Sequence, residues 1–389
     1  MFLALLYALA VSPCAAQRIA GMQEMLDGAM LPSVEVETFE HTETLYPSNI
    51  APRGPHVREF NRNAQQIQGI RFQSSGRTYD LFDYLAENRI AGILVLKNGR
   101  IAFEDYELGA GPQTRWASFS MAKSVASTLI GIALHQGLIS SLDDPITRYA
   151  AALRGSVYEG VTIRNVLQMA SGVKWDETYT DPASDCRKLM DAQLTQRPGA
   201  SMAYMATLSR AGPPGAIWNY NSGEANIAGA ILESATGKPL AAYLSDTLWS
   251  KLGMERDAIW WTESPGGMGL SGTGIGATLR DYARFAFFVQ QDGVLDGKRM
   301  VPEGWFEQAG ASHTIGGKLV NYGYFWWPVP AGDPIHAGAF EARGIFGQFM
   351  YINPRERLVI VVLSARPKPT GSTVLDDSAF LAAVARSLQ

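Results

Sequence analysis

The sequence predicts an α+β protein, in which an antiparallel sheet lobe is flanked by helices and an all-helical lobe is inserted into it. Two observations lead to this prediction. Runs rich in β-branched residues lie near both ends of the chain, and the segments between them carry apolar residues at helical spacing. The chain has 389 residues, more than the roughly 250–300 at which a single core stops growing. We therefore expect two lobes, and a cleft between lobes is the usual place for a site.

Composition and charge exclude two classes of protein. Apolar residues make up 47% of the chain and charged residues 18%, whereas a disordered chain combines low hydrophobicity with high charge. Lys and Arg number 33 and Asp and Glu 37, for a net charge of -4. Binding to nucleic acid by bulk charge needs a basic surplus, so we expect no nucleic-acid partner.

Residues 1–17 have the pattern of a secretion signal. An unbroken apolar run over 2–11 is followed by Pro13 and the small residues Ala15 and Ala16. This run is too short to span a bilayer core of about 30 Å, and no later run is long enough either, so we expect no stable membrane insertion. We predict cleavage near Ala16 and a periplasmic or secreted protein. Cleavage would leave Cys186 without a partner for a disulfide.

The body of the chain, residues 76–389, follows a segment over 18–75 that has several prolines and little periodicity. We predict that this segment is an irregular N-terminal arm laid over the body. The body begins with a predicted helix over 78–88. Two β-rich runs then flank Asn98-Gly99 over 90–95 and 101–106, which is a strong hairpin signal.

The later elements follow the same two patterns. Strands are predicted over 347–352 and 358–364, and a helix over 374–388. The helical lobe is expected over about 140–290. Its predicted helices cover 163–170, 223–236, 240–252 and 279–291. In the last of these, Arg280, Asp281 and Arg284 are predicted to mark the polar face.

A serine and a lysine open a strongly apolar helix. Ser120 precedes the run over 121–134, and Lys123 lies one turn along on the same face. A buried lysine without a partner is costly, and desolvation lowers its pKa, so its amine could take the Ser120 proton. The helix N-terminus also presents unpaired N–H groups to a developing oxyanion. The alternative is an N-capping serine beside a lysine that extends to solvent.

A second Ser-x-x-Lys sequence runs from Ser171 to Lys174. Gly172 lies inside it, which is typical of a helix end with a glycine cap, so we interpret it as a solvated turn.

Tyr220 stands in a loop just before a predicted helix. A tyrosine in this position can point its phenol into a cleft, where a phenolate held between cations such as Lys123 can act as a general base and later as an acid. Considered alone, Tyr220 would be a packing residue with a satisfied hydroxyl.

From about residue 81 to 388 the sequence resembles the serine β-lactamase and penicillin-recognising superfamily, in particular its class C-like branch with esterases and 6-aminohexanoate-dimer hydrolases. The resemblance implies a β-lactamase/transpeptidase-like fold. The matching stretches follow the family's order: Ser-Met-Ala-Lys at 120–123, then 143–146, 162–172, Tyr-Asn-Ser-Gly at 220–223, 277–285 and 344–354.

The resemblance implies a role for each matching residue. Ser120 would be the acylated nucleophile, Lys123 its activator and Tyr220 the general base and acid. The backbone N–H groups of Ser120 and Ile345 would form the oxyanion hole, and Ser222 would help to hold Lys123 or the substrate. No cofactor is implied. The sequence gives no zinc site, because the histidines form no HExxH-like pair.

The strand that closes the cleft departs from the family's pattern. Members that hydrolyse β-lactams usually carry Lys-Thr-Gly there, and its lysine binds the antibiotic carboxylate. Residues 336–343 of this chain lack that motif. His336 with Gly338 could take its place, or Arg343 could hold a carboxylate through its planar guanidinium. The departure favours ester or linear-amide hydrolysis.

Residues 175–182 resemble the substrate loop of the nylon-oligomer hydrolases. Tyr179 could donate to an amide leaving nitrogen, and Asp181 or Asp185 could bind a substrate ammonium. An acidic loop that simply faces solvent fits the same residues.

We therefore expect an exported serine hydrolase, without metal or cofactor, that acts through an acyl-enzyme on a small-molecule ester or linear amide. A β-lactamase or D-alanyl peptidase-like enzyme is one alternative. A non-catalytic binding protein of the cell envelope is another. The absence of Gly-x-Ser-x-Gly argues against an α/β-hydrolase.

Overall fold

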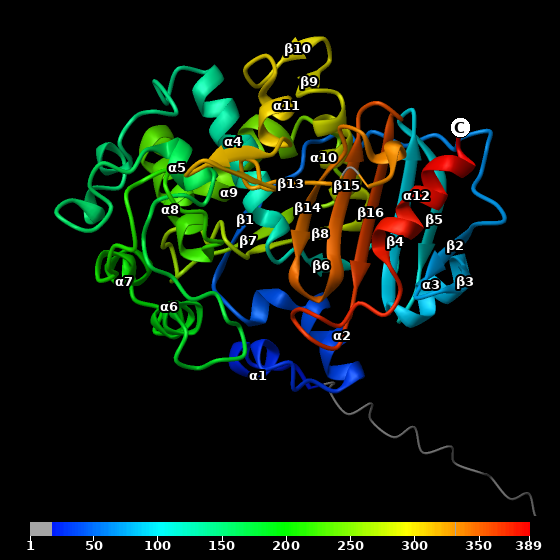
Figure 1. Cartoon of the computed structure of the whole chain (residues 1–389), viewed down its shortest axis with the longest axis horizontal. Helices are drawn as coiled ribbons and strands as arrows, with labels where there is room; N and C mark the ends of the chain where they lie inside the picture. Colours follow the sequence, from blue (N-terminus) through cyan, green and yellow to red (C-terminus); the bar gives the residue numbers. More distant parts are fainter. Residues whose placement is uncertain (1–17, 331) are drawn as a thin grey trace, which may run out of the picture.

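A computed structural model describes residues 18–330 and 332–389, and the predicted signal sequence lies outside these residues. Its main feature is a six-stranded antiparallel sheet that joins the two ends of the chain (Figure 1). The strand order is β13 (Trp327–Pro328), β14 (Phe340–Gly344), β15 (Gln348–Asn353), β16 (Leu358–Ser364), β4 (Ile90–Lys97) and β5 (Arg100–Tyr106). The strands predicted on either side of Asn98-Gly99 thus pair with those predicted near the C-terminus.

The register assigns the two faces of this sheet to two different layers. Ala342 lies opposite Met350 in β15, and this face packs against α4 (Met121–His135) and α10 (Leu279–Gln290). Arg343 lies opposite Phe349 on the other face, which α12 (Asp377–Ser387) and α3 (Leu81–Glu87) cover. Because successive strand residues alternate between faces, neighbours in β14 belong to different environments.

The helical lobe lies beside the sheet and is built around α8 (Ser222–Thr236), which packs against α4. The other helices of this lobe are α5 (Ile163–Leu167), α6 (Asp185–Leu194), α7 (Ala200–Ala206), α9 (Leu240–Leu244) and a π turn over Ser245–Trp249. Helix α10, expected as the last helix of this lobe, instead packs on the six-stranded sheet. The helix α4 therefore runs between the two lobes.

The N-terminal segment is more regular than expected. It contains α1 (Met22–Leu26), α2 (Pro32–Glu40) and β1 (Ser48–Ala51). Strand β1 pairs with β7 (Ala258–Trp261) in a second sheet, whose other strands are β8 (Ile275–Thr278) and β6 (Arg115–Ala117). Short segments such as these show little hydrophobic periodicity, and their secondary structure depends on the distant elements against which they pack.

The predicted helix over 78–88 divides into two elements. Strand β3 (Arg77–Asp80) pairs with β2 (Arg71–Ser74), and α3 begins only after Asp80. Asp80 and Asp83 form a reciprocal capping box, which starts the helix at that point. The remaining short elements are β9 (Val294–Leu295), β10 (Lys298–Arg299), α11 (Trp305–Ala309), β11 (His313–Ile315), β12 (Lys318–Val320) and single turns over Thr42–Thr44, Ile146–Arg148, Ala151–Leu153, Pro334–His336 and Ile345–Gly347.

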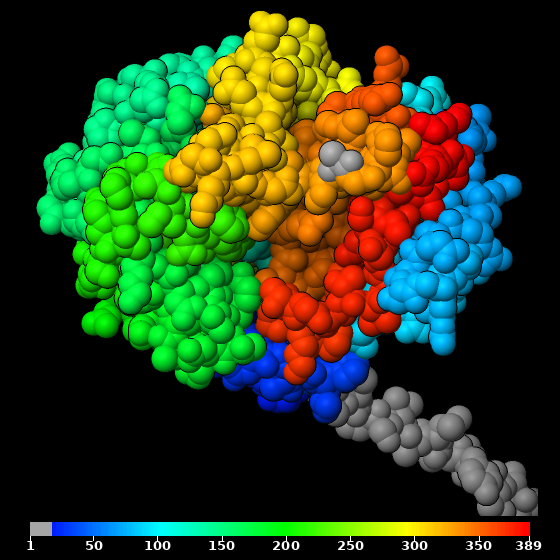
Figure 2. Space-filling view, viewed as in Figure 1, coloured from blue at the N-terminus to red at the C-terminus, as the bar shows by residue number. Residues whose placement is uncertain are grey.

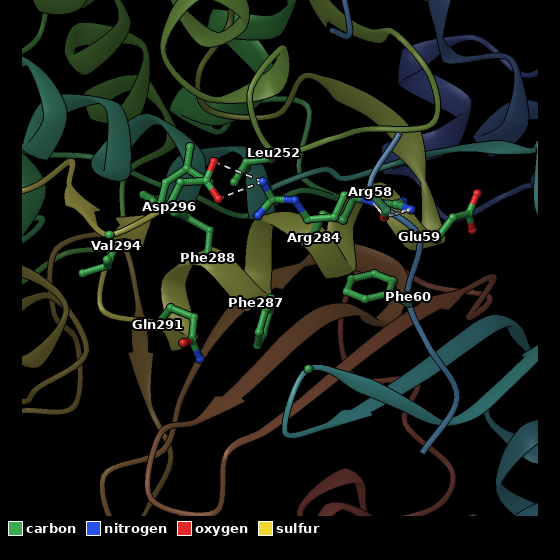
Figure 3. Close-up of a pocket in the computed structure, with 13 residues that line it drawn as sticks. Arg58, Glu59, Phe60, Leu252, Arg284, Phe287, Phe288, Gln291, Val294 and Asp296 are labelled. Atoms are coloured by element: carbon green, nitrogen blue, oxygen red, sulfur yellow. Dashed lines mark hydrogen bonds and ion pairs between the residues drawn. The ribbon is translucent and has the colours of Figure 1, made fainter. Parts of the chain in front are cut away.

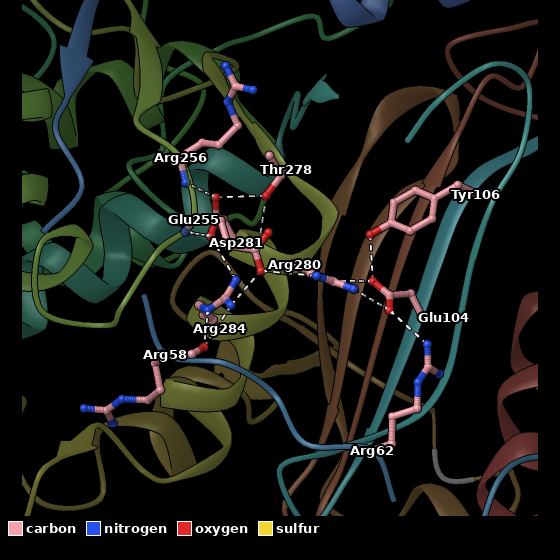
Figure 4. Close-up of polar contacts among 10 residues, drawn as sticks. All are labelled: Arg58, Arg62, Glu104, Tyr106, Glu255, Arg256, Thr278, Arg280, Asp281 and Arg284. Atoms are coloured by element: carbon pink, nitrogen blue, oxygen red, sulfur yellow. Dashed lines mark hydrogen bonds and ion pairs between the residues drawn. The ribbon is translucent and has the colours of Figure 1, made fainter. Parts of the chain in front are cut away.

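The charged residues of α10 form a buried ionic network instead of an exposed polar face (Figure 4). Asp281 is fully buried and Arg284 is 4% exposed. Arg284 lies between Asp281, at 3.1 Å, and Glu255, at 2.8 Å. Arg280 reaches Glu104 in β5 with two hydrogen bonds. The predicted polar face thus points into the protein, because Glu255 and Glu104, from distant segments, neutralise its arginines.

Over the described residues, no helix is both long enough and apolar enough to cross a membrane.

Candidate active site

Ser120 stands at the N-terminus of α4, where the chain turns sharply from β6 into the helix. Phe119, immediately before it, has a positive φ of 45°, which is an uncommon conformation for a residue with a side chain. Its ring packs against Phe39 and Phe346, at centroid distances of 5.0 and 5.3 Å. This packing holds the turn, and it keeps Ser120 at the bottom of a crevice with 7% of its surface exposed.

Lys123 lies one turn above Ser120 and is 1% exposed. Its Nζ is 2.7 Å from Ser120 Oγ and donates to the Gly272 carbonyl at 2.6 Å. Burial lowers the pKa of Lys123 to about 8, although the Glu177 carboxylate acts in the opposite direction. A measurable fraction of the amine is therefore neutral near neutral pH, and it lies within reach of the serine proton.

The loop that carries Gly272 fits closely against α8. Asn226 Oδ1 accepts a hydrogen bond from the Gly272 N–H at 2.9 Å. A Cβ atom at position 272 would come within 2.8 Å of the Ser222 carbonyl oxygen, so only glycine fits there without a shift. The carbonyl that holds Lys123 is thereby fixed in place.

Tyr220 lies against Lys123 from the helical lobe. The Lys123 Nζ is 5.1 Å from the centre of its ring, and the ring stacks on Trp327 at 5.6 Å. Burial, reinforced by the Glu177 carboxylate, raises the pKa of Tyr220 above its usual value, and a hydrogen bond with Ser120 lowers it only in part. The resting side chain is therefore a neutral phenol beside the serine. The structure thus brings Ser120, Lys123 and Tyr220 together.

Glu177 is a central residue of the site that the sequence argument missed. Its carboxylate accepts hydrogen bonds from the hydroxyl and the backbone N–H of Ser222, from the Tyr179 hydroxyl at 3.0 Å, and from the Trp175 indole. It raises the pKa of both Lys123 and Tyr220. The available signal was an acidic residue two positions before Tyr179, but the solvated-loop interpretation fitted the sequence equally well.

Two backbone N–H groups at the crevice are free to bind an oxyanion. Among the described residues, neither the Ser120 N–H nor the Ile345 N–H donates to a backbone carbonyl. Both residues line the same cavity. Ile345 begins a short turn after β14, and the N–H of the next residue, Phe346, is bonded to the Pro369 carbonyl. The donor expected at residue 345 is thus available.

A buried acid supports the turn that carries Tyr220. Glu224 is 1% exposed, and its carboxyl accepts from the Ser171 hydroxyl and, at 3.3 Å, from the Asn221 amide. Asn221 in turn caps α8 at the Glu224 N–H. Ser171, interpreted as part of a solvated turn, is 2% exposed. That interpretation was wrong because Glu224 gives the Ser171 hydroxyl a buried partner.

The cavity beside Ser120 is bordered by Tyr179 and Ser222, two of the residues expected to bind substrate. Both are bonded to Glu177. Asp181 is exposed and accepts from the Ala183 N–H at 2.8 Å, and it is not among the residues that line the cavity. The Asp185 carboxylate accepts hydrogen bonds from the Asp176 N–H and from the Tyr204 hydroxyl.

His336 and Arg343 do not reach this cavity, which corrects the expectation that either replaces the missing lysine. His336 is buried between Tyr351 and Ser378. Arg343 pairs with Glu341 and lines a separate polar cavity, the hollow over β14 and β15 in Figure 2. The physical reason is strand alternation, because Arg343 faces α12 whereas Ala342 faces α4.

A further cavity of about 320 Å³ lies between α10 and the arm residues around Phe60 (Figure 3). The Arg58–Asp296 ion pair borders it, and Phe60 packs edge-on against Phe287. None of the site residues named above lines it. Within residues 18–330 and 332–389, no group of three or more His, Cys, Asp or Glu side chains is placed to hold a metal ion.

Known proteins resemble this chain in sequence and in fold. The family model described as Beta-lactamase matches residues 68–384. The 6-aminohexanoate-dimer hydrolase of Paenarthrobacter ureafaciens is 32% identical over 308 residues, which cover 75% of this chain and 77% of that protein. Esterase EstB of Burkholderia gladioli is 22% identical over 352 residues, covering 72% and 87%. A solved structure from Bacillus anthracis, named as a proposed 6-aminohexanoate-dimer hydrolase, has a TM-score of 0.77 at 23% identity and covers 91% of this chain and 92% of that chain.

The chain belongs to the beta-lactamase family. It is a serine hydrolase of ester or amide bonds with the β-lactamase/transpeptidase-like fold. The fold class and the family expected from the sequence are both confirmed.

Proposed function

We propose that the protein is an exported hydrolase that forms an acyl-enzyme on Ser120 and acts on small esters or linear amides. One observation carries the proposal: the Lys123 amine, with a pKa lowered to about 8 by burial, lies 2.7 Å from Ser120 Oγ. Among the described residues, no carboxylate contacts this amine directly. Its burial destabilises the charged form, which would bring no benefit to a site without catalytic activity.

In acylation, neutral Lys123 takes the Ser120 proton while Oγ attacks the substrate carbonyl. A new Oγ–C bond forms, and the oxyanion lies against the N–H groups of Ser120 and Ile345. Collapse of this intermediate breaks the bond to the leaving group. Tyr220, a neutral phenol at rest, donates its proton to the departing oxygen or nitrogen. The proton on Lys123 then restores the phenol.

In deacylation, the same groups act on water. Neutral Lys123 takes one proton from a water molecule whose oxygen adds to the acyl carbonyl. The Oγ–C bond then breaks, and Lys123 returns the proton to Ser120 Oγ. The net reaction consumes one water and releases an acid and an alcohol or amine. The carboxylate of Glu177 holds Ser222 and Tyr179, which border the cavity beside Ser120, and its charge raises the pKa of Lys123 and Tyr220.

Two features favour an ester or linear amide over a β-lactam. The relative at 32% identity is named for a linear amide, the 6-aminohexanoate dimer. The β14 residue that faces α4 is Ala342, so this strand brings no lysine to the crevice for an antibiotic carboxylate. A D-alanyl peptidase and a non-catalytic binding protein are the alternatives that the same fold allows.

Export is part of the proposal and is supported by the sequence of residues 1–17 alone. Expression of the full chain in a Gram-negative host, followed by fractionation and N-terminal sequencing, tests it. We expect a periplasmic product that begins near residue 17. A product that stays cytoplasmic with Met1 intact would contradict export and leave the hydrolase proposal standing.

Fluorophosphonate labelling tests the acyl-enzyme. We expect the wild type to be labelled at Ser120, as located by peptide mass spectrometry, and to hydrolyse p-nitrophenyl acetate. Ser120→Ala should lose labelling and at least about 10³-fold in kcat/KM. Ser124→Ala, one position beyond Lys123 in the same helix, should retain both. Absence of labelling and of hydrolysis in the wild type would favour the non-catalytic binding protein.

A further inference from the structure

We propose that the cavity beside Ser120 receives a short, uncharged aliphatic acyl group, and that the N-terminal helix α1 limits the length of that group. This inference rests on the proposed function, whose site it shares. It names a substrate class for the crevice and assigns a role in specificity to the segment expected to be an irregular arm.

The lining of the cavity is uncharged and mainly apolar over the described residues, with Gln193, Asn226 and Thr273 among its polar members. Its walls come from α1, from α6 and from the strands next to Ser120, and none of the lining side chains is a Lys, Arg, Asp, Glu or His. The apolar lining residues are Met22, Met25, Leu26, Tyr46, Phe119, Leu189, Met190, Trp261 and Ile345. A substrate ammonium or carboxylate placed there would lose its hydration without gaining a partner of opposite charge, which is strongly unfavourable.

Helix α1 is fastened to both sides of the crevice. Asp27 forms an ion pair with Arg187 in α6 at 2.5 Å. The Gly28 carbonyl accepts a hydrogen bond from Lys368, which lies beyond β16, at 2.7 Å. Figure 1 shows α1 below α6 and beside the loop that follows β16. Met25 is fully buried at this junction. The helix therefore forms a fixed wall of the cavity.

The position of Tyr220 indicates which part of the substrate enters. The cavity is lined by Ser120 and Ile345, the residues that carry the oxyanion donors, but Tyr220 is not among its lining residues. The leaving group must lie beside the phenol that protonates it. The acyl group, on the other side of the reacting carbon, is the part that faces Met25, Leu189 and Met190.

The volume sets the length. The cavity measures about 50 Å³, and one water-sized group needs roughly 10–15 Å³ on that measure, so it holds roughly three to five such groups. This is enough for an acyl chain of about four carbons. Burial of each further methylene would be favourable if it found apolar space, but α1 blocks the way.

The cavity's preference for uncharged acyl groups is tested by the hydrolysis of methyl esters, which is monitored by titrating the acid that is released. Two pairs matched in chain length serve: methyl pentanoate against monomethyl succinate, and methyl butanoate against methyl 3-aminopropanoate. We expect kcat/KM to be at least about 100-fold higher for methyl pentanoate than for monomethyl succinate, and higher for methyl butanoate than for the amino ester. Equal or better hydrolysis of the charged member of either pair would overturn the inference.

Variants of α1 test the length limit. With p-nitrophenyl esters from acetate to octanoate, the wild type should have its highest kcat/KM near butyrate. Met25→Ala should move the optimum to about hexanoate, because it opens the α1 wall. Gln23→Ala, on the exposed face of the same helix, is the matched control and should leave the optimum at butyrate. Met190→Ala opens the cavity from α6 and provides an independent variant if Met25→Ala does not fold.

An unchanged optimum in folded Met25→Ala or folded Met190→Ala would refute the role of this cavity. Failure of the proposed function has a different signature, because no ester would then be hydrolysed and Ser120 would not be labelled.

Discussion

Ser222 gives two hydrogen bonds to one carboxylate: its backbone N–H, at 3.0 Å, and its hydroxyl both donate to Glu177. The pair joins the loop after α5 to the first turn of α8. It also holds a negative charge close enough to raise the pKa of Lys123 and Tyr220. The charge on Glu177 therefore helps to set the pH at which the serine is activated.

The first prediction concerns pH. Lys123 must be neutral to accept a proton, so kcat/KM of the wild type should rise with pH, with an apparent pKa of about 8. Glu177→Gln removes the charge that raises the Lys123 pKa and should shift the rise to lower pH. The pH profile of p-nitrophenyl butyrate hydrolysis measures this shift.

Asp181→Asn is the control for this experiment, since Asp181 is an exposed carboxylate in the same loop. It should leave the profile unchanged. A Glu177→Gln profile that superposes on the wild type would show that Glu177 does not act on Lys123.

The second prediction separates the acid role of Tyr220 from a packing role. Tyr220→Phe keeps the ring on Trp327 and removes the proton donor. The loss in kcat/KM should be about 10²–10⁴-fold for a methyl ester, whose alkoxide needs a proton to leave. It should be much smaller for a p-nitrophenyl ester, whose leaving group is stable as an anion. Equal losses for both substrates would contradict the acid role.

The third prediction concerns the oxyanion hole. Ile345→Pro removes one N–H group, and Gly344, with ψ of 156°, already has the backbone conformation that precedes proline. Loss of one such donor costs about 10²–10³-fold in kcat. Ile345→Ala keeps the N–H and should retain most of the activity. Thermal unfolding of both variants shows whether the fold is intact, and equal activity of the two would exclude this donor.

The fourth prediction concerns stability. Burial raises the pKa of Glu224 to about 8, so the folded chain holds a proton there that the unfolded chain releases near pH 4.5. Between these values the wild type should lose stability as pH rises, by roughly 1.4 kcal/mol per unit of pKa difference at most. Glu224→Gln should lack this loss and be more stable than the wild type at pH 8, but not at pH 4.5. Urea unfolding at both values measures the difference.

The fifth prediction concerns the buried network of α10. Arg284→Met leaves Asp281, which is fully buried, without its cation and should lower the free energy of unfolding by about 3–5 kcal/mol. Arg299→Met breaks the Arg299–Asp292 pair, whose side chains are 33% and 46% exposed, and should cost less than about 1 kcal/mol. Chemical denaturation of the two variants compares them. Similar losses in the free energy of unfolding would show that the buried network stabilises the fold no more than an exposed ion pair does.

Much of the fold could be predicted because its strongest signals are local. Strand β16 has the predicted bounds, and β4 and β5 flank Asn98-Gly99 as expected. Strand β7 and helix α1 were missed, since each is short and its structure depends on a distant partner. The burial of Arg284 could not be predicted from helical periodicity, because periodicity concerns only residues of the same helix and Glu255 lies outside it.

The candidate site likewise contains residues that could be predicted from the sequence and residues that could not. Ser120, Lys123 and Tyr220 occur in motifs, so the sequence was enough to group them, and the structure brings their side chains together. Glu177 and Glu224 have no motif, and an acidic residue in a loop is usually solvated. Arg343 was misplaced because the register of β14, which a single sequence does not give, decides the face on which it lies.

The hydrogen bond between Lys368 and Gly28 joins positions 340 residues apart. The second of the two attachments of α1 therefore forms only after nearly the whole polypeptide has been synthesised and its last strand has paired. Contacts of such long sequence separation are entropically expensive to close and form slowly. A nascent or truncated chain that ends before β16 would contain the nucleophile and yet be unable to hydrolyse its substrate.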